Sequence, residues 1–101
     1  MIQVSVRRFR GSILSLSIQG HADPLVCAGV STVFVGACNA LKDIDRFSIR
    51  IAGGDSSLEA LQEYDEHDAT VLETLLVQLQ TVGEKYPHEI RIQISEKGQI
   101  K

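Results

Sequence analysis

A histidine and a cysteine, His21 and Cys27, lie six residues apart and supply the two groups that a cysteine hydrolase needs. The thiolate attacks a carbonyl carbon, and the imidazole accepts and returns the proton. Asp23 followed by Pro24 is typical of a helix start, where unpaired N–H groups favour a thiolate. The sequence therefore predicts acyl-transfer chemistry at this junction, with backbone N–H groups of the helix start stabilising the oxyanion.

The same residues also have a purely structural interpretation. Free cysteine is among the most buried residue types, and Cys27 begins an apolar helical stretch. The carboxylate of Asp23 opposes the helix dipole, because a nearby negative charge disfavours a thiolate. Ser31 follows Cys27 by one helical turn and would orient or solvate the pair. Cys38 is expected in the core or in an interface, three turns from Cys27 and beyond disulfide reach.

Hydrophobic periodicity predicts the elements that must position this junction. Alternating apolar and polar residues indicate strands, and apolar residues at spacings of three and four indicate helices. Turns are expected at 8–12 and at Gly53-Gly54-Asp55, the second helix begins at Asp65 or Asp68, and a polar tail occupies 96–101. The expected elements are strands over 2–7 and 13–19, a helix over 24–42, strands over 45–52 and 56–62, a helix over 66–85 and a strand over 89–95.

This order, β-β-α-β-β-α-β, predicts an α+β fold in one domain over residues 1–101. We expect a two-layer sandwich, with two helices on one face of a mostly antiparallel sheet. The first helix is apolar on most sides, including Val35 and Ala40. It is therefore expected to pack between the sheet and a second surface, such as a partner subunit in a homodimer.

Composition and charge argue against several kinds of partner. The net charge of -3 disfavours a broad basic surface for nucleic acid, and the cluster Arg7, Arg8 and Arg10 is typical of a solvated hairpin tip. The chain has no apolar run of about 18 residues, so no membrane span is expected. Two cysteines without an export signal favour a cytoplasmic location.

Metal and phosphate sites are not expected either. His67 and His88 form no compact zinc-binding spacing with His21 or Cys27, and Gly53-Gly54 lacks the lysine of a phosphate-binding loop, so we expect no cofactor. Acidic residues gather at the start of the second helix, where they complement the helix dipole or attract a basic peptide segment. The acidic residues are Glu63, Asp65, Glu66 and Asp68.

The strings Gly20-His21-Ala22 and Val26-Cys27-Ala28-Gly29-Val30-Ser31 resemble the signature of the ribosomal-processing cysteine protease family. The resemblance implies a small bacterial cytoplasmic homodimer that removes a short N-terminal extension from a protein of the large ribosomal subunit. It makes His21 the catalytic histidine and Cys27 the nucleophile. Gly20 matches the glycine before the histidine, which permits a close backbone approach, and Ser31 matches the serine after the cysteine.

The chain departs from this family pattern between the histidine and the cysteine. The resemblance implies a longer, mobile loop ending in Asp-Ile-Val-Cys, whereas here the link is Ala22-Asp23-Pro24-Leu25-Val26. Pro24 stands in the place of that aspartate, and Asp23 is one position earlier. A shorter link is expected to leave the site more open, to alter specificity, or to hold His21 away from Cys27. Two functions therefore remain: a ribosomal-processing cysteine endopeptidase, and a catalytically weakened or inactive homodimeric binding module in ribosome assembly.

Overall fold

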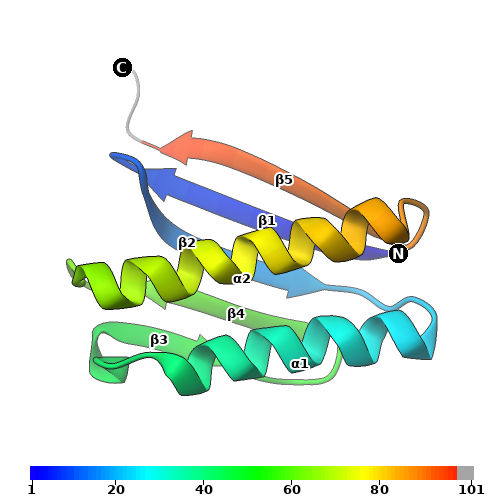
Figure 1. Cartoon of the computed structure of the whole chain (residues 1–101), viewed down its shortest axis with the longest axis horizontal. Helices are drawn as coiled ribbons and strands as arrows, with labels where there is room; N and C mark the ends of the chain where they lie inside the picture. The colour runs from blue at the N-terminus through cyan, green and yellow to red at the C-terminus, as the bar shows by residue number, and fades with distance from the viewer. Residues whose placement is uncertain (98–101) are drawn as a thin grey trace.

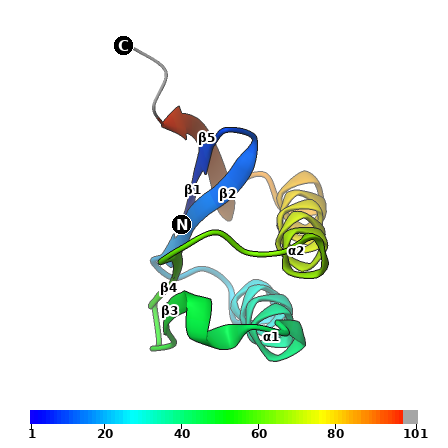
Figure 2. The same cartoon turned by 90° about the vertical axis from the view of Figure 1, so that its left-hand side faces the viewer.

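The computed structural model describes residues 1–97 and has the expected α+β architecture. Both helices cover one face of a five-stranded sheet, and the two layers are seen edge-on in Figure 2. The predicted order of strands and helices is confirmed, with one 3₁₀ helix added before the third strand. The elements are β1 (Ile2–Phe9), β2 (Ser12–Gln19), α1 (Pro24–Ala40), η1 (Ile44–Arg46), β3 (Phe47–Arg50), β4 (Asp55–Ala60), α2 (Glu66–Lys85) and β5 (Ile90–Lys97).

The sheet has the order β3-β4-β2-β1-β5, and every neighbouring pair is antiparallel except the parallel pair of β1 and β5. α2 provides the crossover to β5 that parallel pairing requires. The helices run in opposite directions, so α2 begins beside the end of α1 (Figure 1). Alternate strand residues and one stripe of each helix form the core, which includes Ile2, Val4, Val6, Ile13, Leu16, Val30, Phe34, Leu58, Leu72, Leu75 and Leu79.

The predicted turn at 8–12 is too long, because the strands of the first hairpin extend to Phe9 and resume at Ser12. Arg10 and Gly11 make the turn, with φ angles of 54° and 82°. Arg8 stays in the strand because its guanidinium donates two hydrogen bonds of 2.8 Å to the carboxylate of Glu73 on α2. Arg8 is therefore half-buried between the layers, whereas the sequence placed it at a solvated tip.

Two other boundaries also differ from the prediction. The strand expected over 45–52 is shortened to β3, because η1 occupies Ile44–Arg46 and Ile51 lies beyond the strand with 56% of its surface exposed. The tail predicted over 96–101 is wrong at its start, because Glu96 and Lys97 stay paired with β1 as part of β5, and its remainder, 98–101, lies outside the described residues. Within residues 1–97, no helix combines the length and the apolar character that crossing a membrane requires.

Candidate active site

Both predicted catalytic residues lie near the junction of β2 and α1, with His21 in the connection and Cys27 in the helix. Asp23 is the N-cap of α1, as expected, and its carboxylate accepts a hydrogen bond of 2.9 Å from the N–H of Leu25. Pro24 is the first helical residue, where its missing N–H costs nothing. The N–H of Asp23 donates to the carboxylate of Glu89, which immediately precedes β5, at 2.7 Å. The start of α1 is thus hydrogen-bonded to the residue that precedes the last strand.

Cys27 lies in the first turn of α1 and is half-buried. The N–H of Ala22 donates to its sulfur at 3.2 Å, and the thiol donates to the carbonyl oxygen of Ala22 at 3.4 Å. The short link therefore folds back over the sulfur and offers it an N–H donor, which can stabilise negative charge. Both cysteines are free, and Cys38 is buried, which raises the pKa of its thiol. Of the two thiols, that of Cys27 is the more accessible.

His21 is exposed, and its imidazole lies over Gly54 in the turn between β3 and β4. Gly54 has a φ of 76°, and a Cβ added there would come within 2.7 Å of Cε1 of His21. Within residues 1–97, no hydrogen bond joins this imidazole to Cys27. His21 and Cys27 therefore lie on either side of the start of α1, but the imidazole rests against the turn between β3 and β4.

Gly20 has a φ of 99° and packs directly against the start of β1. A Cβ at this position would overlap the carbonyl oxygen of Met1, so a side chain is excluded on steric grounds as well as by the backbone angle. The N–H of Gly20 donates to the carbonyl oxygen of Gly54 at 3.0 Å. The residue before His21 is therefore fixed to the same turn that receives the imidazole.

Ser31 is exposed on α1, one turn after Cys27, and it lines a cavity of about 260 Å³. The cavity lies between α1 and the turn that joins β3 to β4, and its apolar lining includes Val30, Phe34 and Ile51. In the described part of the chain, the Ser31 hydroxyl makes no hydrogen bond with Cys27. Ser31 thus borders a space beside the site and is not hydrogen-bonded to the sulfur.

The N–H groups expected to form an oxyanion hole are partly in use. Pro24 has none, the N–H of Leu25 donates to the Asp23 carboxylate, and that of Cys27 donates to the Asp23 carbonyl oxygen at 2.9 Å. Val26 supplies the remaining N–H of this first turn. The same capping that makes the helix begin here therefore reduces the number of donors for a reacting carbonyl.

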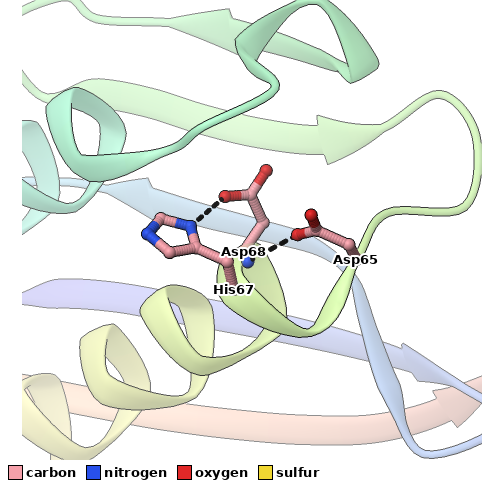
Figure 3. A group of neighbouring side chains, drawn as sticks. All are labelled: Asp65, His67 and Asp68. Carbon is pink, nitrogen blue, oxygen red and sulfur yellow. Dashed lines mark hydrogen bonds and ion pairs between the residues drawn. The ribbon is translucent and has the colours of Figure 1, made fainter.

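The acidic cluster at the start of α2 is mostly structural (Figure 3). Asp65 is the N-cap and accepts from the N–H of Asp68, and its other oxygen binds Lys42 at 3.1 Å. Asp68 is fully buried and accepts from the N–H groups of Lys42 and Asp43 and from Nδ1 of His67. The carboxylate and imidazole atoms lie within 4.8 Å of one another, which resembles a metal-binding group. Hydrogen bonds already account for this arrangement. Nδ1 of His67 carries a proton when it donates to Asp68, so that nitrogen is not free to bind a metal.

Burial of the Asp68 carboxyl raises its pKa, but hydrogen bonds from Lys42, His67 and Asp43 outweigh that effect, and the pKa lies below its ordinary value. Asp68 therefore remains an anion that anchors the segment after α1. This contact explains why α1 ends at Ala40 and not at 42: the N–H groups of Lys42 and Asp43 point to Asp68. The buried carboxylate offers nothing to a basic peptide at the surface.

Two residues that contact the candidate site, Gly54 and Glu89, were not anticipated from the sequence. Gly53-Gly54 was predicted as a turn, which is correct, but its contact with His21 depends on the pairing of β2 with β4. The register that sets Gln19 opposite Asp55 brings this turn beside His21, and no local sequence pattern indicates that register. The contact between Glu89 and Asp23 joins residues from opposite parts of the chain, and no local pattern indicates it.

A family model described as cysteine protease Prp matches residues 1–91. The ribosomal processing cysteine protease Prp of Staphylococcus aureus is 32% identical over 92 residues, which cover 81% of this chain and 87% of that protein. The protein of the same name from Bacillus subtilis is 32% identical over 107 residues, covering 91% of this chain and 96% of the relative.

Solved structures agree with this relationship. The S. aureus protease Prp with a covalently linked product peptide has a TM-score of 0.84 and 31% identity, covering 93% of this chain and 99% of that one. The same enzyme with a substrate peptide gives a TM-score of 0.83 and 29% identity over the same shares of the two chains. Together with the Gly-His-Ala and Val-Cys-Ala-Gly-Val-Ser segments at the junction of β2 and α1, these matches show that the chain belongs to the Prp family and is a cysteine protease.

Proposed function

We propose that this chain removes the N-terminal extension of a protein of the large ribosomal subunit. Its relatives are named as ribosomal processing proteases, and the S. aureus structures hold a substrate peptide and a covalently linked product peptide. The single observation that carries the proposal is the thiol of Cys27 in the first turn of α1, half-buried, with the N–H of Ala22 directed at its sulfur.

Cys27 acts as the nucleophile and His21 as the general base and acid. The sulfur bonds to the scissile carbonyl carbon as His21 takes the thiol proton, and the N–H of Val26 contributes to stabilising the oxyanion. The C–N bond then breaks, and His21 gives its proton to the leaving amine. Water hydrolyses the resulting thioester, which releases the carboxylic acid and restores the thiol.

The imidazole of His21 rests against Gly54 and is not hydrogen-bonded to Cys27 in the described residues. The catalytic pair is therefore completed when substrate binds. Catalytic hydrogen bonds are often absent or long in free enzymes and shorten when substrate binds. The exposed imidazole can keep its Nε2 edge against Gly54 while a small rotation brings Nδ1 toward the bound peptide, and this adjustment does not disturb the core. The short link therefore still permits catalysis, with the two side chains meeting around the bound peptide.

The test is cleavage of a peptide that spans a bacterial ribosomal N-terminal extension and its processing site. We expect the wild-type chain to cleave it, and Cys27→Ala and His21→Ala to lose about 1,000-fold or more of the rate. Cys38→Ala is the matched control, because it removes the buried thiol of the same helix. Cleavage that persists in Cys27→Ala would overturn the assignment, and peptide binding without turnover in the wild type would support the binding-module alternative.

We also propose that the protein is a cytoplasmic homodimer. The support is the exposed apolar surface of α1, where Leu25 is 69% exposed, and a groove of about 390 Å³ between α1 and α2 lined by Val33, Ala37 and Val71. Gly36 also lines this groove, and a Cβ there meets open space. Sedimentation at micromolar concentration should show a dimer that Gly36→Glu dissociates, and a wild-type monomer would contradict the proposal.

The cytoplasmic location is supported by the thiol that catalysis needs, because a reducing compartment keeps thiols free. Cell fractionation tests the location.

A further inference from the structure

Gly54 lies in the turn between β3 and β4, far from His21 in sequence but in contact with its imidazole. The nearest atoms to the position of an added Cβ are Nε2, Cε1 and Cδ2 of His21, with Cε1 at 2.7 Å and Cδ2 at 3.4 Å. Any L-amino acid other than glycine would therefore place its side chain where the imidazole now lies. The absence of a side chain at residue 54 creates the space that the ring occupies.

A second contact ties the same turn to the backbone beside the histidine. The carbonyl oxygen of Gly54 accepts the N–H of Gly20 at 3.0 Å, and Gly20 is itself packed against the carbonyl of Met1. The ring and the preceding backbone of His21 are therefore both held by one residue. The edge of the ring that carries Nε2 faces Gly54, so Nδ1 is the nitrogen farther from the turn.

We propose that Gly54 is a positioning residue that seats the imidazole of His21 for proton transfer. This inference rests on the proposed role of His21 as general base and acid. We call the side-chain-free surface of Gly54 that packs against the imidazole the seat. An exposed histidine without a seat samples several rotamers, and an unproductive rotamer must change when substrate binds. The seat restricts this freedom and presents Nδ1 as the nitrogen that exchanges the proton with Cys27 and the leaving amine.

The decisive variant is Gly54→Ala, compared with Gly11→Ala. Gly11 has a φ of 82°, similar to the 76° of Gly54, but an added Cβ there meets no atom within 4 Å. Both variants carry the same backbone strain, and only one displaces the imidazole. We expect kcat to fall about 10- to 100-fold in Gly54→Ala with a smaller change in KM, and to stay near the wild-type value in Gly11→Ala.

A double variant separates positioning from general damage. In a His21→Ala background, Gly54→Ala should cause no further loss of rate, because the side chain that it displaces is absent. An equal loss in both backgrounds would overturn the proposal. A rise in kcat in Gly54→Ala would also overturn it, since the seat would then hold the imidazole away from the reaction.

Nuclear magnetic resonance of the free protein tests the seat without any need for activity. Cross-peaks are expected between the α protons of Gly54 and the ring protons of His21 in the wild type. The His21 ring signals should shift in Gly54→Ala and stay unchanged in Gly11→Ala. If these signals behave as expected and no peptide is cleaved, the proposed function fails and the seat stands. If the cross-peaks are absent while cleavage depends on Cys27 and His21, the seat fails and the function stands.

Discussion

The two helix N-termini of this protein contain similar residues and use them in opposite ways. Asp23 caps the start of α1 and Asp65 that of α2, and each aspartate accepts a hydrogen bond from a backbone N–H of the first turn. Each start also has a histidine within two residues of the cap, at His21 and at His67. The two junctions lie at opposite ends of the helical layer, because α1 and α2 run in opposite directions (Figure 1).

The difference is in how completely the polar atoms are paired. At α2, the Asp68 carboxylate is fully buried and receives three hydrogen-bond donors, one of them His67. At α1, Cys27 is half-buried with a single N–H on its sulfur, and the imidazole of His21 is exposed. A fully paired cluster stabilises the fold and has no capacity left for a ligand, whereas an incompletely paired one can react.

The largest expected effect is on stability, in Asp68→Ala. Removing the fully buried carboxylate leaves the N–H groups of Lys42 and Asp43 without their acceptor, so the free energy of unfolding should fall by about 3 kcal/mol. Urea denaturation measures this loss, and peptide cleavage at a temperature where the variant is folded should stay within about twofold of the wild type. Glu66→Ala, exposed in the same helical turn, is the control. A large loss of cleavage by folded Asp68→Ala would remove the distinction between the two junctions.

The next effect concerns the two cysteines of α1. Cys38 is 4% exposed and burial raises the pKa of its thiol, whereas Cys27 is only partly buried at the helix start. Iodoacetamide at pH 8 should modify Cys27 about 100-fold faster than Cys38, as measured by mass spectrometry of labelled peptides. In 8 M urea the two rates should converge, which serves as the control. Equal modification rates of Cys27 and Cys38 in the folded protein would show that the start of α1 is as inaccessible to the reagent as the buried part of the helix.

A smaller effect is expected from the cap of α1. Asp23→Ala removes the acceptor for the N–H of Leu25 and should lower the free energy of unfolding by about 1 kcal/mol. Asp23→Asn keeps an acceptor oxygen and should recover most of that loss. Thermal and urea unfolding of the three proteins measure the difference. An Asp23→Asn variant as unstable as Asp23→Ala would point to the negative charge, and not the hydrogen bond, as the stabilising feature.

The smallest effect is a pH dependence at the start of α2. The pKa of Asp68 is lowered in the folded state, so its contribution to stability is present above the unfolded pKa of about 3.9 and is lost as pH falls through the folded pKa. The stability difference between wild type and Asp68→Ala should therefore be constant near neutral pH and shrink below about pH 4. Urea unfolding from pH 7 to pH 3 measures it, and a difference that grows on acidification would contradict the assigned charge state.

The sequence by itself determined the features that depend on near neighbours. Asp23-Pro24 specified the start of α1, and the apolar spacing specified α2 over 66–85, because capping and helical packing involve residues within one or two turns. The paired segments around His21 and Cys27 likewise indicated the family before any fold was known. Arg8 was misjudged for the corresponding reason: its partner, Glu73, lies on a helix that the local pattern could not place beside it.

Only the tertiary structure decided where the imidazole of His21 rests and which carboxylate is buried. The seat at Gly54 depends on the register of β2 against β4, and the burial of Asp68 depends on α2 beginning where α1 ends. Such contacts join residues distant in the chain, and their energies depend on how whole elements pack. The sequence therefore named the candidate reacting groups, and the packing of the sheet and helices determined which polar side chains are fully paired and which are not.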